Sequence, residues 1–263
     1  MDLGIAGKRA LVLGGNRGIG QGIAQALVRE GVHVAITGRD VERMNAAVVE
    51  LRACHAGAQV EAFAVDLADT ASLELFAAKV TKGFGPIDIL VNNTGGPGYG
   101  GASGRGITEW TSSFNDMVLS VITLTDALLP GMRQRQWGRV MTVVSSGVVQ
   151  PIPILGVSNT LRNALVAWSK TLSMEVAKEG VTVNVLVPGR IDTERVRLTD
   201  EAVAQKDGIT AEEAKRRSTS TIPMGRYGAP AEFGALAAFV AGMPASYITG
   251  SMLRCDGGNI RSV

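Results

Sequence analysis

Hydrophobic and polar positions alternate along the chain in a repeated strand–helix pattern. Short apolar runs predict buried strands at residues 9–15, 33–39, 59–67, 87–93, 138–146, 181–189 and 251–258. Segments with apolar residues at helical spacing follow them and predict helices at 22–31, 40–55, 69–83, 108–135, 157–179, 193–217 and 230–242. Strands that are apolar throughout and separated by helices indicate a parallel sheet covered on both faces.

This pattern predicts an α/β fold with a single Rossmann-type, doubly wound domain over residues 1–263 and a sheet of about seven strands. The sequence shows no internal repeat, and no linker is long enough to indicate a domain boundary. The polar stretch near the C-terminal third, about residues 190–225, is the expected substrate-loop region.

Composition narrows the function classes. Hydrophobic residues make up 46% of the chain and charged residues 19%, which suits one folded core. A net charge of +2 with no basic block argues against nucleic-acid and membrane-surface binding. No signal peptide or run of 18 apolar residues is recognisable, so a cytoplasmic protein is expected. Cys54 and Cys255 are expected to be buried free thiols, and no metal site is predicted.

The turn after the first strand, "GGNRGIG", carries the strongest chemical signal. Gly14, Gly18 and Gly20 stand in a G-x3-G-x-G spacing just before a helix. Glycines allow a tight turn and a close approach of the backbone to phosphate, and the helix N-terminus supplies free N–H groups. Its position in the first strand–helix unit predicts a nucleotide site.

The end of the second strand indicates which nucleotide binds. An acid that would bind a free ribose 2′-hydroxyl is missing there, because Gly38 and Arg39 occupy the place. Arg39 and Arg17 are two guanidinium groups suited to a 2′-phosphate, and Asp40 is expected to cap the next helix. The predicted cofactor is therefore NADP(H).

Several motifs in order resemble the short-chain dehydrogenase/reductase family from Gly7 to Gly258, most closely its 3-oxoacyl-carrier-protein reductases. Besides the glycine loop, they are "VDL" with Asp66, "NNTG" (92–95), "PGRIDT" (188–193), "IPMGRYGAPAEF" (222–233) and "SYITGSMLRCDGG" (246–258). The resemblance implies cofactor contacts from Gly14, Asn16, Arg17, Gly18, Ile19, Gly20, Arg39, Asp66, Leu67, Asn93, Gly95, Arg162, Pro188, Gly189, Ile191 and Thr193.

The same resemblance implies a catalytic tetrad of asparagine, serine, tyrosine and lysine, of which only the serine, Ser145, is retained. The flanking motifs place Ser158 at the tyrosine position, Arg162 at the lysine position and Met117 at the asparagine position. The sequence has no tyrosine between Tyr99 and Tyr227, so a shifted alignment cannot restore one. Asn115 is two residues away from Met117 and would point elsewhere on a helix.

The candidate catalytic residues are therefore Ser145, Ser158, Arg162 and Tyr99, the last in the loop expected to shape the substrate pocket. They can polarise a substrate but are poorly equipped for acid–base work, because arginine stays charged and serine is a weak acid. Asp192 and Glu194 lie near the mouth of the predicted site and are expected to cap a helix rather than to supply a proton, and His33 and His55 are expected to be structural.

Three functions remain open at this point. One is an NADP(H)-dependent oxidoreductase acting on a small carbonyl, alcohol or imine-type substrate by an altered proton route. The others are a catalytically silent, cofactor-binding regulatory protein and a lyase, hydrolase or dehalogenase on the same scaffold. The intact glycine loop favours the first two functions over the third, and "PGRIDT" favours the oxidoreductase. The resemblance also implies a homotetramer or homodimer, formed through the helices at 108–135 and 157–179.

Overall fold

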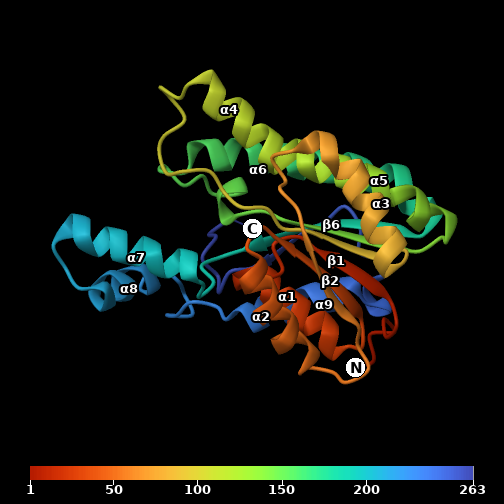
Figure 1. Cartoon of the computed structure of the whole chain (residues 1–263). Helices are drawn as coiled ribbons and strands as arrows, with labels where there is room; N and C mark the ends of the chain where they lie inside the picture. The colour runs from red at the N-terminus through yellow and green to blue at the C-terminus, as the bar shows by residue number, and fades with distance from the viewer. Residues whose placement is uncertain (263) are drawn as a thin grey trace.

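The apolar runs form a seven-stranded parallel sheet with strand order β3-β2-β1-β4-β5-β6-β7 (Figure 1). The computed structural model describes residues 1–262. The strands are β1 (Arg9–Val12), β2 (His33–Gly38), β3 (Val60–Ala64), β4 (Ile89–Asn92), β5 (Gly138–Val143), β6 (Val181–Pro188) and β7 (Met252–Cys255). All seven predicted strands are confirmed, each somewhat shorter than predicted because residues at one or both ends already belong to loops. The strand order reverses between β1 and β4, where open α/β sheets form a crevice at the carboxyl ends of their strands.

Helices cover both faces of the sheet, as predicted (Figure 1). One face carries α1 (Gly18–Arg29), α2 (Val41–Arg52) and α9 (Pro230–Ala241). The other carries α3 (Leu73–Phe84), α4 (Ile107–Phe114), α5 (Ser120–Gln134) and α6 (Gly156–Val176). The remaining helices, α7 (Glu194–Asp207) and α8 (Ala211–Thr219), project as a hairpin beside the sheet.

Close packing of α1 against α9 depends on small residues. A Cβ on Gly22 would lie 2.4 Å from the carbonyl oxygen of Pro230, and one on Gly234 would lie 2.2 Å from the oxygen of Gly22. Leu27 and Phe233 are fully buried in the same core. The two helices can thus approach closely. This packing fixes the N-terminus of α1, which the glycine loop leads into directly.

Three predicted helices differ in detail. Helix α1 begins at Gly18 rather than at residue 22, because the glycine loop leads directly into it. The predicted helix 108–135 is interrupted by a π turn at Asn115–Leu119. The predicted helix 193–217 is wrong as one element: Gly208 takes a left-handed conformation and ends α7, and the hydroxyl of Thr210 accepts from the N–H of Glu213 and caps α8.

Two smaller expectations are also settled. Cys54 and Cys255 are free thiols, but they are half-buried rather than buried. Within residues 1–262, none of the helices combines the length and apolar character that crossing a membrane requires.

Candidate functional site

The glycine loop is a tight turn that forces β1 directly into α1. Gly14 and Gly18 have φ values of 59° and 55°, which residues with a Cβ rarely adopt. A Cβ on Gly20 would lie 2.2 Å from the carbonyl oxygen of Gly14, so only glycine fits there. Arg17 precedes α1 with no side-chain cap, and the first turn holds no acidic residue. The N-terminal N–H groups of α1 and the positive end of its dipole are thus available to an anion.

Neighbouring strands hold the glycine loop in place. The amide nitrogen of Asn93, just after β4, donates to the carbonyl oxygen of Leu13 at 3.1 Å. The N–H of Gly14 donates to the hydroxyl of Thr37 on β2 at 3.2 Å. The side chain of Asn16 lies against Gly38 at the end of β2, and Ile19 packs into the core below. The predicted loop residues therefore meet at the carboxyl ends of β1, β2 and β4.

The end of β2 is basic and open. Arg39 is exposed, and Asp40 caps α2 as predicted by accepting from the N–H of Arg43 at 3.0 Å. Asp66 accepts from the N–H of Ala68 at 3.1 Å, while Leu67 packs into the core between the sheet and α3 and α5. Asp116 of the π turn also belongs here. Its partial burial and the charge of Asp66 raise its pKa, and the guanidinium of Arg39 lowers it.

Glu194 joins this basic surface from the first turn of α7. Its carboxylate lies 3.3 Å from a guanidinium nitrogen of Arg17 and 3.0 Å from one of Arg43. Hydrogen bonding to Arg43, followed by the charges of Arg43 and Arg17, lowers the pKa of Glu194. Glu194 therefore connects the glycine loop, α2 and α7, a role that the sequence does not indicate because the contacts span more than 150 residues.

Arg162 is a buried cation at the centre of the site. Only 8% of its surface is exposed. Its guanidinium donates to the carbonyl oxygens of Val143 at 3.0 Å, Gly95 at 2.9 Å and Thr94 at 3.4 Å. No carboxylate among residues 1–262 lies within ion-pair distance of it. Burial, and secondarily the charge of Arg195, lowers the pKa of Arg162 to about 10, so it remains protonated at neutral pH.

The other predicted tetrad positions lie on α6, just after β5 and in the π turn. Ser158 lies one turn before Arg162 on the buried side of α6 and is 6% exposed. Ser145 follows β5 and is half-buried, and its hydroxyl oxygen accepts from the N–H of Gly147 at 3.1 Å. Met117, in the π turn, is buried in an apolar cluster with residues of α5 and α6. Asn115, the first residue of the π turn, is half-buried and lines a shallow pocket with Ile107, Thr108, Thr111 and Ser112 of α4, whereas Met117 faces the core.

A further buried hydroxyl lies beside Arg162. Thr94 Oγ1 has no hydrogen-bond partner among the described residues. A Cβ on the next residue, Gly95, would meet no atom within 4 Å, so the chain is open on that side. The carboxyl end of β4 thus presents a polar, uncrowded edge.

The segment after β6 faces the glycine loop. The N–H of Gly189, the residue after Pro188, donates to the carbonyl oxygen of Cys255 at 3.0 Å, and Ile191 is buried and pairs with Gly228. Thr193 caps α7 by accepting from the N–H of Val196, so the capping role expected of Asp192 or Glu194 is wrong. The methyl group of Thr193 lies 3.3 Å from the position that a Cβ on Gly18 would take.

Helix α7 closes the outer edge of the site. The hydroxyl of Tyr99, half-exposed in the loop after β4, lies 2.5 Å from the hydroxyl of Thr199 on α7. Buried Asp200 accepts from the hydroxyl of Tyr227 at 2.8 and 2.9 Å, which ties α7 to the segment before α9. Tyr99 therefore bridges the mouth of the site and does not reach Arg162 through any hydrogen bond in the structure.

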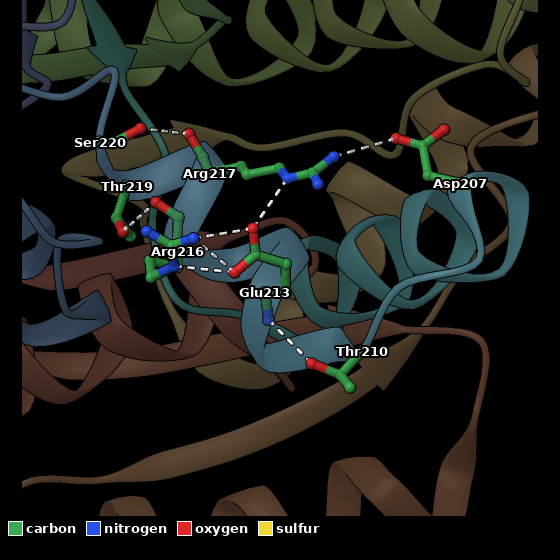
Figure 2. Close-up of polar contacts among 7 residues, drawn as sticks. All are labelled: Asp207, Thr210, Glu213, Arg216, Arg217, Thr219 and Ser220. Carbon is green, nitrogen blue, oxygen red and sulfur yellow. Dashed lines mark hydrogen bonds and ion pairs between the residues drawn. The ribbon is translucent and has the colours of Figure 1, made fainter.

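Figure 2 shows how the far end of α7 is tied to α8. Glu213 accepts from Arg216 at 2.8 Å and from Arg217 at 2.9 Å, and Arg217 also lies 3.8 Å from Asp207. These contacts are exposed and individually weak. Together with the Thr210 cap, these contacts hold α7 and α8 together as one hairpin.

The two histidines lie away from this site, as expected. His33 is at the start of β2, where its ring accepts from the N–H of Gln59 at 2.9 Å. His55 follows α2 and accepts from the N–H of Gly57 at 3.1 Å. Among residues 1–262 no three histidine, cysteine, aspartate or glutamate side chains gather as metal ligands would.

Comparison with known proteins identifies the family. A family model described as short chain dehydrogenase matches residues 8–204. The chain belongs to the short chain dehydrogenase family. Within it, the chain is 34% identical to the 3-oxoacyl-acyl-carrier-protein reductase of Escherichia coli over 255 residues, covering 96% of this chain and 97% of that protein. It is 30% identical to the NADPH-dependent reductase BacG of Bacillus subtilis over 256 residues, covering 97% and 99%.

Solved structures of short chain dehydrogenases share the fold. The L-sorbose reductase of Gluconobacter frateurii, solved in complex with NADPH and L-sorbose, superposes with a TM-score of 0.95, 31% identity and full coverage of both chains. The family and fold that the sequence motifs implied are thus confirmed.

Proposed function

We propose that this short chain dehydrogenase is an NADP(H)-dependent oxidoreductase. It would transfer hydride to or from a small carbonyl, alcohol or imine-type substrate without an acidic side chain of the protein. One observation carries this proposal: a complete glycine loop and an uncompensated buried cation, Arg162, lie at the same carboxyl edge of the sheet. NADPH-dependent relatives support the choice of cofactor.

The residues present fit a dinucleotide with a 2′-phosphate. The uncapped N-terminus of α1 suits a pyrophosphate, and Arg17 and Arg39 suit the additional phosphate. The open edge at Gly95 and the orphaned hydroxyl of Thr94 leave room and a polar partner near Arg162. We propose that the cofactor contacts are Gly14, Asn16, Arg17, Gly18, Ile19, Gly20, Arg39, Asp66, Leu67, Asn93, Gly95, Arg162, Pro188, Gly189, Ile191 and Thr193.

NADPH supplies a hydride equivalent when bound, so the protein has to orient the substrate and stabilise charge. Arg162 holds a positive charge in a water-poor setting, where it stabilises negative charge that develops on a substrate oxygen. The hydroxyls of Ser145 and Ser158 can donate hydrogen bonds to the same oxygen. The proton then comes from water or from an acidic group on the substrate.

The charge of the site narrows the substrate types. An iminium ion needs no proton donor, but Arg162 and Arg195 would repel its positive charge. A substrate that becomes negatively charged at oxygen is attracted instead. Simple ketones, which carry no negatively charged group for the site to bind, would remain poor substrates, because water alone would have to protonate their alkoxides.

We also propose a setting for this activity. The chain would act in the cytoplasm as a single domain over residues 1–263, with about 190–225 as its substrate loop, in a homotetramer or homodimer. Exposed apolar side chains on α4 and α6, such as Ile107 and Met174, support assembly through these helices. Light scattering at micromolar concentration would show a monomer if this is wrong.

The proposed function is tested by cofactor binding and turnover measured separately. Calorimetry should show tighter binding of NADPH than of NADH, and a panel of carbonyl and imine compounds should contain one that drives NADPH oxidation. Absence of NADPH binding would contradict the proposal. Binding without turnover of any compound would favour the regulatory alternative.

A further inference from the structure

Arg195, in the first turn of α7, brings a second positive charge to the substrate side of the site. Its guanidinium nitrogens lie 2.8 and 2.9 Å from the position that a Cβ on Gly96 would take. Gly96 follows directly on Thr94 and Gly95, whose carbonyl oxygens accept from Arg162. Arg195 therefore lies over the same short loop that Arg162 supports from below.

No acidic side chain among residues 1–262 pairs with Arg195. The one hydrogen bond that its guanidinium makes to these residues is a long contact of 3.5 Å to the carbonyl oxygen of Pro97. The adjacent acid, Glu194, pairs with Arg17 and Arg43 instead. The next arginine along the helix, Arg197, has its own partner in Asp192 at 3.7 Å.

Arg162 is uncompensated too, and the two charges influence each other. The hydrogen bonds of Arg162 to main-chain oxygens use at most three of its five N–H donors. The positive charge of Arg195 contributes to lowering the pKa of Arg162. Arg195 is exposed, so water stabilises its charge in the free protein, whereas the buried Arg162 has no such hydration. An anion that binds beside both guanidinium groups would pair with the two charges.

We propose that the substrate carries a carboxylate, which pairs with Arg195 while the carbonyl to be reduced lies towards Arg162. A single planar guanidinium matches the two oxygens of one carboxylate. Thr199 lies one turn after Arg195 on α7, and Thr199 and its partner Tyr99 would close over the remainder of the molecule. This inference rests on the proposed function and specifies its substrate class.

Matched pairs of acids and esters test this substrate class. NADPH-dependent reduction is measured for phenylpyruvate and acetoacetate and for their methyl esters, with wild type, Arg195→Gln, Arg195→Lys and Arg197→Gln. Arg197→Gln is the control, because Arg197 is an exposed arginine on the same helix that pairs with Asp192. We expect the wild type to prefer the acids. Arg195→Gln should lower kcat/KM for them by about 10- to 100-fold through KM, the value of a charge-assisted contact.

The esters and the control variant distinguish a specific contact with the carboxylate from a general loss of activity. Arg195→Gln should change kcat/KM for the esters by less than about twofold, Arg197→Gln should match wild type, and Arg195→Lys should recover part of the loss. Equal use of acids and esters, or equal loss on both with Arg195→Gln, would overturn the inference. Preference for a phosphorylated carbonyl compound over the acids would overturn the choice of carboxylate.

A binding experiment separates this inference from the proposed function. The affinity of phenyllactate and of its amide for the NADPH-loaded protein is measured by calorimetry. Tighter binding of the acid, lost in Arg195→Gln, would uphold the carboxylate site even if no compound is turned over. Equal binding of acid and amide would refute the site whatever the activity.

Discussion

Replacement of Arg162 by methionine distinguishes a functional charge from a structural one. The guanidinium donates short hydrogen bonds to the carbonyl oxygens of Val143 and Gly95. Their loss should cost about 2–6 kcal/mol, because each buried carbonyl left without a donor costs about 1–3 kcal/mol. Removal of a buried charge returns about 3 kcal/mol, the equivalent of lowering the pKa of Arg162 to about 10. The two contributions partly offset each other and leave a net cost of between about −1 and +3 kcal/mol.

We therefore expect Arg162→Met to change the free energy of unfolding by less than about 3 kcal/mol. The NADPH-dependent activity should nevertheless fall at least about 100-fold, as when a charge-stabilising donor is lost from an active site. Urea unfolding followed by circular dichroism measures the stability, and initial rates measure the activity. Both are taken on the same protein preparation.

Arg139→Met is the matched control. Arg139 is also buried, with its pKa lowered by desolvation, but it lies at the start of β5, the opposite end of that strand from the site. Its replacement should leave kcat/KM close to wild type. A loss of more than about 5 kcal/mol in Arg162→Met, beyond what the two contributions allow, would refute the reasoning and make Arg162 a structural support.

Three other charged side chains, those of Arg39, Glu194 and Glu232, can be tested by substitution. Arg39→Ala should weaken binding of NADPH by about tenfold without affecting binding of NADH, as measured by calorimetry with both cofactors. An equal loss of affinity for both cofactors would show that Arg39 does not contact the 2′-phosphate. Glu194→Gln frees Arg17 and Arg43 and should tighten NADPH binding by about two- to fivefold relative to NADH, whereas unchanged selectivity would show that Glu194 does not compete for the phosphate site. Hydrogen bonds from Arg226 and the N–H of Ala229 lower the pKa of Glu232 to about 2. Glu232→Gln should therefore lower the urea midpoint at pH 7, and the difference from wild type should shrink as the pH falls from 4.5 towards 2; a pH-independent difference would contradict this ion pair.

The sequence predicted the parts of the fold that local pattern controls. Every strand was recognisable because buried parallel strands are apolar over their whole length. The glycine loop was recognisable because Gly14, Gly18 and Gly20 meet conformational demands that few other residues meet. Even the break between α7 and α8 had a local signal, since Gly208 and the Thr210–Glu213 spacing are typical of a helix end and a new cap.

The charge network of the site could not be predicted in the same way. Glu194 reaches Arg17 and Arg43 across most of the chain, and no local pattern records such a contact. Arg195 looks in the sequence like any exposed helical arginine. Its importance comes from lying over Gly96 without an acidic partner, which depends on how α7 packs against the loop after β4.

The central claim is that the protein reduces its substrate without a side-chain acid, and restoring that acid tests it most directly. Steady-state reduction of a simple ketone by NADPH is compared between wild type and the double variant Ser158→Tyr, Arg162→Lys, whose two positions lie one turn apart on α6. We expect very slow turnover by the wild type and faster turnover by the double variant. Wild-type turnover of the simple ketone near an ordinary enzymatic rate of about 10 per second would contradict it and require another proton donor.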